Sequence, residues 1–243
     1  MNESGWVDGQ SQQDHGTQGG NVVSKQKLTV VLPKGRLLAV LRPLFAEAGL
    51  HGAEELEEDR RLLLDGPDGF RYLLARPADV VTYVRQGAAD MGLTGKDCLL
   101  ESPGGFFEVL DTGLGYCRMV VAGPNGARDR WNRALEGSAT IRVASKFPGI
   151  SRSYLSQKQV EAEIIQLGGA VELAPLVGLA EVIIDLVQTG GTLKANGLQI
   201  FEEIMPITTR LIVNQSSYRT KEASLTPLIE RIRRAVNREV PSV

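Results

Sequence analysis

The chain has 243 residues, of which 42% are hydrophobic and 23% charged, and its formal net charge is −2. This composition is typical of a globular protein with a sizeable core, and it lacks the basic surplus of a dedicated nucleic-acid-binding protein. No hydrophobic run approaches the ~20 residues that span a bilayer, and no secretory signal is visible at the N-terminus. We therefore expect a cytoplasmic protein without membrane or nucleic-acid partners, and the two cysteines, Cys98 and Cys117, fit a reducing compartment.

Residues 1–26 are rich in Gly, Gln, Ser and Asn, which predicts a disordered tail. From Leu28 onward, short apolar strands alternate with helical patterns, as in an α/β sheet. The first set of elements comprises strand Leu28–Leu32, a helix ended by Gly49, a hairpin of Arg61–Asp65 with Phe70–Ala75, helix Ala78–Gln86, strand Asp90–Thr94 and a helix from Lys96.

A second α/β set follows, and the chain closes on a helix predicted to begin at Thr226-Pro227. Its elements are Cys117–Ala122, Ile141–Ser145, Ser151–Val160, Glu163–Leu167 and Val182–Leu186, before a further strand at Arg210–Val213. We predict a two-lobed fold with a cleft between two α/β domains, of the type II periplasmic-binding-protein kind. Lobe I comprises residues 27–116 with 210–243, lobe II comprises residues 117–209, and Cys117–Ala122 and Arg210–Val213 are the candidate crossing segments.

The segment with the clearest chemistry is the turn after the predicted strand Val182–Leu186. It holds Thr189-Gly190-Gly191-Thr192, where exposed backbone amides and a helix start suit a phosphate monoester and the threonine hydroxyls donate further hydrogen bonds. Asp185, at the end of the strand, is a good acceptor for sugar hydroxyls or for Mg²⁺-bound water. The turn therefore predicts a site for a ribose 5-phosphate group.

The same segment resembles the signature of the ATP phosphoribosyltransferase family. The matching residues are Glu172, Gly178-Leu179-Ala180, Ile183-Ile184-Asp185-Leu186 and Thr189-Gly190-Gly191-Thr192-Leu193. The resemblance continues in LPKGRL at 32–37, in residues 75–99 and in RLIVNQ at 210–215, and it covers almost everything from Leu28 to the closing helix.

The resemblance implies the first reaction of histidine biosynthesis. The family joins N1 of the adenine of ATP to C1 of phosphoribosyl pyrophosphate and releases pyrophosphate, with Mg²⁺ as cofactor. A ring nitrogen is already unprotonated at neutral pH, so the reaction demands no side-chain nucleophile, which agrees with a chain whose two histidines, His15 and His51, are not placed for catalysis. Cations on the departing pyrophosphate would be the main source of rate acceleration.

The resemblance also implies roles for charged residues beside the predicted turns. Family members carry a catalytic arginine where Arg60 and Arg61 stand, and both remain candidates. The implied catalytic residues are Arg36, Arg60 and Arg61, and the implied ATP-binding residues are Lys34, Arg76, Asp79 and Lys96.

Each of these residues also has a purely structural interpretation. A lysine or arginine beside a surface turn is ordinarily just solvated, and Asp79 is more readily an N-cap of the helix that follows it. Lys146 and Arg152, near the turn at Ala144–Gly149, are weaker candidates, and Glu172 could serve only to brace its loop.

The chain stops soon after the closing helix, whereas long family members continue into a regulatory domain that binds histidine. It therefore resembles the short-form catalytic subunit, which implies a homodimer within a hetero-oligomer and a regulatory partner similar to histidyl-tRNA synthetase. Two alternatives remain: a ligand-binding module built on the same two lobes, and a phosphoribosyltransferase that acts on another base.

Overall fold

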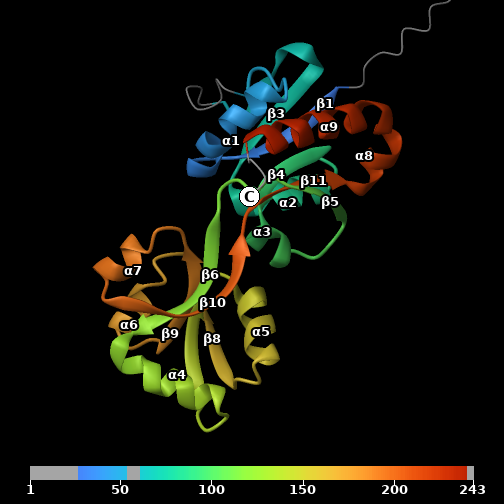
Figure 1. Cartoon of the computed structure of the whole chain (residues 1–243). Helices are drawn as coiled ribbons and strands as arrows, with labels where there is room; N and C mark the ends of the chain where they lie inside the picture. Colours follow the sequence, from blue (N-terminus) through green and yellow to red (C-terminus); the bar gives the residue numbers. More distant parts are fainter. Residues whose placement is uncertain (1–26, 54–60, 240–243) are drawn as a thin grey trace, which may run out of the picture.

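The structure, a computed structural model, describes residues 27–53 and 61–239. The predicted disordered tail and the candidate Arg60 lie outside these residues. Figure 1 shows two lobes, each built around its own sheet, with β6 and β10 extending from the junction into the second lobe. Among the described residues, no helix is long and apolar enough to cross a membrane.

The sheet of lobe I, sheet A, has the strand order β2-β3-β1-β4-β11-β5 within the described chain. Strands β1, β3 and β4 run parallel, while β2, β11 and β5 pair antiparallel with their neighbours. The strands are β1 (Leu28–Pro33), β2 (Leu63–Asp65), β3 (Phe70–Ala75), β4 (Met91–Gly95), β5 (Phe106–Asp111) and β11 (Thr209–Asn214).

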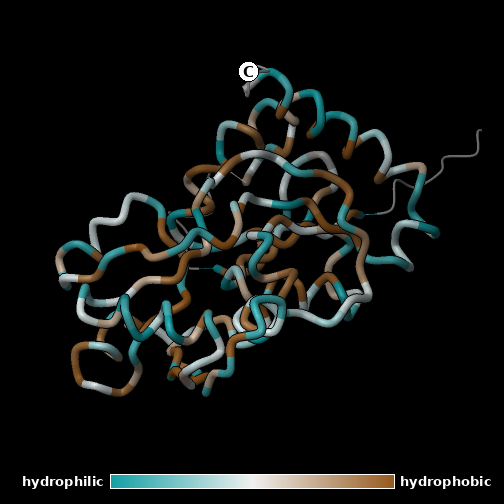
Figure 2. Tube along the Cα trace, turned by 60° about the horizontal axis from the view of Figure 1, so that its bottom comes forward, coloured by the Kyte–Doolittle hydropathy of each residue, from teal (hydrophilic) through white to brown (hydrophobic). Residues whose placement is uncertain are grey.

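Helices cover both faces of sheet A, because its central strands are apolar on both sides. Helices α1 (Arg36–Glu47) and α9 (Glu222–Glu239) pack on one face, and α2 (Pro77–Arg85) and α3 (Lys96–Leu100) pack on the other. The short helix α8 (Gln215–Thr220) joins β11 to α9. Near the C-terminal label in Figure 2, α9 alternates between hydrophobic and hydrophilic residues, and its hydrophobic stripe is buried against sheet A.

The sheet of lobe II, sheet B, has the order β10-β6-β9-β7-β8, with β7, β8 and β9 parallel and β6 antiparallel to both neighbours. Helices α4 and α5 pack on one face, and α6 and α7 on the other. The elements are β6 (Cys117–Pro124), α4 (Arg128–Leu135), β7 (Ile141–Ser145), α5 (Pro148–Gln157), β8 (Ala162–Gln166), α6 (Leu173–Leu176), β9 (Val182–Val187), α7 (Gly191–Ala195) and β10 (Leu198–Ile207).

Two strands, β5 and β10, were not predicted, and both predicted crossing segments were wrong. Cys117–Ala122 lies inside sheet B as part of β6 and Arg210–Val213 inside sheet A as part of β11, whereas the chain passes between the lobes at residues 112–116 and at Thr208. Strand β10 pairs with β6, and its two register shifts interrupt the alternation of apolar and polar residues that identifies a strand. We call residues 112–116 and Thr208 the crossing segments below.

Two helix assignments also change. The closing helix begins at Glu222, and Pro227 lies inside it, because the first turn carries Leu225, which is fully buried. Helix α4 forms between β6 and β7, where no helix was predicted. Its Trp131 is only 2% exposed and anchors the helix on sheet B.

Candidate active site between the carboxyl edges of the two sheets

The strand registers bring the carboxyl edges of the two sheets toward each other. In sheet A, Gly95 at the end of β4 pairs with Thr209, the first residue of β11 after the crossing segment. In sheet B, Val187 at the end of β9 pairs with Arg118, the second residue of β6 after the other crossing segment. Ligands of α/β sheets bind beyond the carboxyl ends of the strands, so both edges contribute to the same interlobe region.

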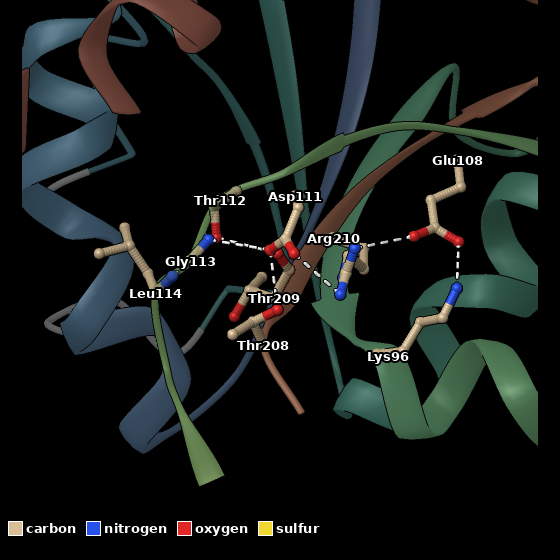
Figure 3. Close-up of polar contacts among 9 residues, drawn as sticks. All are labelled: Lys96, Glu108, Asp111, Thr112, Gly113, Leu114, Thr208, Thr209 and Arg210. Atoms are coloured by element: carbon tan, nitrogen blue, oxygen red, sulfur yellow. Dashed lines mark hydrogen bonds and ion pairs between the residues drawn. The ribbon is translucent and has the colours of Figure 1, made fainter. Parts of the chain in front are cut away.

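Hydrogen bonds link the crossing segment at residues 112–116 to Thr209, the first residue of β11, and link Thr208 to Asp111, the last residue of β5 (Figure 3). The backbone amide and the hydroxyl of Thr112 both donate to the carbonyl of Thr209, over 3.0 and 2.9 Å, and the amide of Thr209 donates to the carbonyl of Leu114 over 2.9 Å. The hydroxyl of Thr208 donates to the carboxylate of Asp111 over 2.7 Å. The chain is therefore held by hydrogen bonds at both places where it passes between the lobes.

Three of the predicted cations lie exposed at the carboxyl edge of sheet A. Pro33 and Ala75 are register partners at the ends of β1 and β3, so Lys34 and Arg76 follow neighbouring strands. Arg36 opens α1 directly after Gly35, whose φ of 75° suits glycine. The fold therefore brings Lys34, Arg36 and Arg76, which were selected from the sequence, to the same edge of sheet A.

Lys96 has a different environment. Its ammonium is 2.5 Å from the carboxylate of Glu108 on β5, and the same carboxylate accepts from Arg210 over 3.2 Å (Figure 3). Arg210 also pairs with Asp111 over 2.9 Å. Lys96 is thus part of a network beside the crossing segments, and contact with ATP would require its ammonium to leave Glu108.

Two further candidates, Arg61 and Asp79, lie near the carboxyl end of β3. The carbonyl of Leu62 accepts from the amide of Leu74, so Arg61 lies next to the carboxyl end of β3, and its possible alternative Arg60 is outside the described residues. Asp79 is exposed in the first turn of α2, and the N-cap position belongs to Arg76. The interpretation of Asp79 as an N-cap is therefore wrong, because Pro77 starts the helix two residues earlier.

The predicted phosphate-binding turn leads from β9 into α7. Gly190 has a left-handed backbone, with φ of 79°, and α7 begins at the next residue. The backbone amides of Thr189, Gly190, Thr192 and Leu193 donate to no other described residue. Both threonine side chains are exposed, so amides and hydroxyls together can surround an anion.

Asp185 lies at the base of this turn and is half-buried. One of its carboxylate oxygens accepts from the amide of Leu186 over 2.8 Å. Burial raises the pKa of Asp185, the carboxylate of Glu172 raises it further, and the Leu186 amide and the ammonium of Lys146 act in the opposite direction. The side chain retains acceptor capacity that neighbouring hydroxyls can fill.

Long-range charge effects connect the two edges. The pKa of Asp97, a carboxyl in α3 that is only 8% exposed, is raised by burial, and Lys146 is among the groups that oppose this shift. The pKa of Cys117 is raised to about 11 by burial and then by Asp97, while Arg36 opposes the rise. The charge of Lys146 therefore lowers the pKa of both Asp97 in lobe I and Asp185 in lobe II, a relationship that the sequence alone did not reveal.

The two thiols do not supply a nucleophile. Burial, followed by Asp97, raises the pKa of Cys98 to about 12, and that of Cys117 is about 11. Both thiols are thus protonated at neutral pH, and only the deprotonated thiolate is a strong nucleophile. The chemistry available at this site is the binding of anions and hydroxyls.

Comparisons with known proteins agree with this geometry. A family model described as ATP phosphoribosyltransferase (HisG) matches residues 76–234. The ATP phosphoribosyltransferase of Caldanaerobacter subterraneus subsp. tengcongensis is 44% identical over 211 residues, which cover 86% of this chain and 98% of the relative. That of Geobacter metallireducens is 46% identical over 215 residues, with the same two coverages. The aligned residues thus make up nearly the whole length of each relative.

Solved structures resemble the described fold as a whole. The ATP phosphoribosyl transferase (HisG:HisZ) complex from Thermotoga maritima contains a chain that is 35% identical, with a TM-score of 0.72 over 87% of this chain and 99% of that one. The periplasmic aliphatic sulphonate binding protein SsuA from Escherichia coli has a TM-score of 0.55 at 11% identity, covering 86% of this chain and 68% of SsuA. At that identity SsuA bears on the fold alone, and it confirms the predicted two-lobed fold of the periplasmic-binding-protein kind.

Proposed function

Since this chain belongs to the ATP phosphoribosyltransferase family, which carries out the first step of histidine biosynthesis, we propose that phosphoribosyl pyrophosphate binds at the carboxyl edge of sheet B and ATP at that of sheet A. The observation that supports two facing substrate sites is that the carboxyl edges of the two sheets meet at the crossing segments. Transfer then needs only that N1 of the adenine faces C1 of the ribose across the gap.

On the sheet B side, the 5-phosphate of the donor occupies the turn at Thr189–Thr192. Its oxygens accept from the free amides of the turn and from the hydroxyls of Thr189 and Thr192, with Gly190 and Gly191 allowing the backbone to approach closely. Asp185 accepts hydrogen bonds from the ribose hydroxyls. The exposed amides support this assignment, since a buried or paired turn could not receive an anion.

On the sheet A side, Lys34 and Arg76 bind the triphosphate of ATP, with Asp79 beside them and Lys96 free to join when its pair with Glu108 opens. Arg36, together with Arg60 or Arg61, stabilises the departing pyrophosphate. During transfer, N1 supplies the electron pair of the new bond to C1, and the C1–O bond breaks with its electrons leaving on the pyrophosphate. No protein side chain forms a covalent bond.

Mg²⁺ fits this site as an ion held mainly by the substrate. The described residues bring together no group of three histidine, cysteine, aspartate or glutamate side chains that could hold a metal. Asp185 and Glu172 are close enough for one carboxylate to raise the pKa of the other, which suits contact with Mg²⁺ through water. When bound, the ion would neutralise charge on the pyrophosphate.

We further infer that the chain forms a homodimer within a hetero-oligomer, joined by a regulatory subunit similar to histidyl-tRNA synthetase. The 35% identical Thermotoga maritima relative supports this inference because its solved structure is a HisG:HisZ complex. Histidine inhibition should then depend on the partner. Strong inhibition of the isolated chain by histidine would contradict this division, and a cytoplasmic location stays a prediction.

Pyrophosphate release tests the proposed function. Release should require both ATP and phosphoribosyl pyrophosphate and should be accompanied by the absorbance change of phosphoribosyl-ATP formation. Free adenine in place of ATP should give little product, since Lys34 and Arg76 would have no triphosphate to bind. Equal rates with adenine would favour a phosphoribosyltransferase for another base, and binding without turnover would favour a ligand-binding module.

A further inference from the structure

Lys146 lies at the carboxyl edge of sheet B, directly after β7. Ser145 and Ile184 are register partners on the parallel strands β7 and β9, so Lys146 and Asp185 follow them at the same level of the sheet. The buried hydroxyl of Ser145 donates to the carbonyl of Ile184 over 2.6 Å and accepts from the amide of Phe147 over 2.9 Å. These bonds on either side hold the backbone of Lys146 beside Asp185.

Lys146 and the phosphate-binding turn leave sheet B toward opposite faces. Residue 146 leads into α5, which packs on the face covered by α4, whereas residues 189–192 lead into α7, which packs on the face covered by α6. Asp185 lies between these two exits. A ribose held at Asp185 with its 5-phosphate at α7 would therefore extend its other end, the C1 substituent, toward Lys146.

The side chain of Lys146 is exposed and forms no ion pair with any residue that the structure describes, in contrast to several other cations of lobe II. Arg118 pairs with Glu203, Arg142 with Glu181 and Lys158 with Glu202. The ammonium of Lys146 instead lowers the pKa of Asp97 in lobe I and of Asp185 in lobe II. Its charge is thus available to an anion that enters between these carboxyls.

We propose that Lys146 binds the pyrophosphate group of the donor, at the end of the ribose opposite the phosphate-binding turn. This inference rests on the proposed function, because it takes the donor to be bound through Asp185 and the turn. As the C1–O bond breaks, its electron pair leaves with the pyrophosphate, and the ammonium of Lys146 stabilises the charge that develops there.

The test separates the two ends of the donor by calorimetry with two probes, magnesium pyrophosphate and ribose 5-phosphate. In Lys146→Met, pyrophosphate affinity should fall about 10- to 100-fold, as expected for loss of a charge-assisted contact, while ribose 5-phosphate affinity stays within about twofold of the wild type. Lys146→Arg should recover most of the pyrophosphate affinity, because a guanidinium also binds phosphate oxygens. Thr192→Ala should show the reverse pattern, losing ribose 5-phosphate and retaining pyrophosphate.

Lys158→Met is the matched control, since it removes an exposed lysine of the same lobe that already pairs with Glu202. It should leave both probes at wild-type affinity. Wild-type pyrophosphate affinity in Lys146→Met, or an equal loss for both probes, would overturn the assignment of Lys146. If Thr192→Ala left ribose 5-phosphate affinity unchanged, the donor site itself would be wrong, and with it the proposed function of this edge.

Discussion

The carboxylate of Glu101, at the end of α3 in lobe I, accepts a hydrogen bond from the backbone amide of Gly149, the second residue of α5 in lobe II, over 2.9 Å. Its other oxygen accepts from the amide of Ile150 over 2.6 Å. The N-cap residue of α5, Phe147, contributes no side-chain hydrogen bond to these amides. A helix of one lobe is therefore capped by an acid of the other, which couples the two lobes directly.

Replacing Glu101 with alanine should loosen this coupling. Loss of a capping acid typically costs about 1–2 kcal/mol, so the free energy of unfolding should fall by that amount, and the amides of Gly149 and Ile150 should exchange hydrogen faster. Glu161→Ala, at an exposed position of lobe II, is the control and should change neither measurement. Unchanged exchange at both amides in Glu101→Ala would show that the contact does not persist in solution.

Gly115 in the crossing segment should not tolerate a side chain. Its φ is +67°, and a Cβ at this position would lie 2.7 Å from Cδ1 of Leu37 and 2.9 Å from Oγ1 of Thr209. Gly115→Ala should lower the free energy of unfolding by about 2–3 kcal/mol, combining backbone strain with the close contacts. Denaturant titration measures this loss.

Gly137→Ala is the matched control for that variant. Gly137 has a φ of +71°, but a Cβ there would meet no atom within 4 Å. It should lose only about 1 kcal/mol, from backbone strain alone. If the two variants lost the same free energy of unfolding, the contacts of an added Cβ at Gly115 with Leu37 and Thr209 would not affect stability.

Thr192 should contribute to donor binding through its hydroxyl. Removing a hydrogen bond to a charged group costs about 1.5–3 kcal/mol, so Thr192→Ala should weaken the binding of phosphoribosyl pyrophosphate about 10- to 100-fold. The exposed Thr140 lies away from the turn, and Thr140→Ala should bind the donor normally. Calorimetry with donor alone separates this effect from any change in ATP binding, and a Thr192→Ala protein with wild-type affinity would move the phosphate site elsewhere.

Asp185 should make donor affinity depend on pH. Burial and Glu172 raise its pKa, so the carboxyl becomes protonated at a higher pH than an ordinary aspartate. Only the carboxylate can accept hydrogen bonds from ribose hydroxyls with both oxygens, so affinity should fall as the pH falls through the raised pKa. Asp185→Asn should bind about 10- to 100-fold more weakly at neutral pH, and the pH dependence should disappear. Persistence of that dependence in the variant would assign it to another group.

The same shift predicts the opposite effect on stability. Since the folded protein holds this proton more tightly than the unfolded chain, stability falls as the pH rises from the ordinary value of 3.8 through the raised pKa. Asp185→Asn should therefore raise the melting temperature at neutral pH and leave it nearly unchanged at pH values below both pKa values. Asp129→Asn, at an exposed aspartate of α4, should show no such gain.

Local patterns in the sequence predicted much of the fold. Apolar runs such as Leu28–Leu32 and Val182–Leu186 identified the buried parallel strands, because strands covered on both faces exclude polar residues. The same reasoning missed two of the edge strands in the described sheets: β5 has no buried residue in its pattern, and β10 is interrupted by register shifts. Both lie at sheet edges, where one side of the backbone has no neighbouring strand.

By itself, the sequence determined the two α/β lobes, the turn at Thr189–Thr192 and the family, because each depends on residue types at fixed spacings along the chain. Only the tertiary structure decided that Lys96 is paired with Glu108, that Glu101 caps a helix of the other lobe, and that the charge of Lys146 lowers the pKa of both Asp97 and Asp185. These relationships join residues that are 12 to 49 positions apart, by the numbering of the chain. The distance between such groups is set by how the two sheets meet at the crossing segments, and no local pattern of residues encodes that distance.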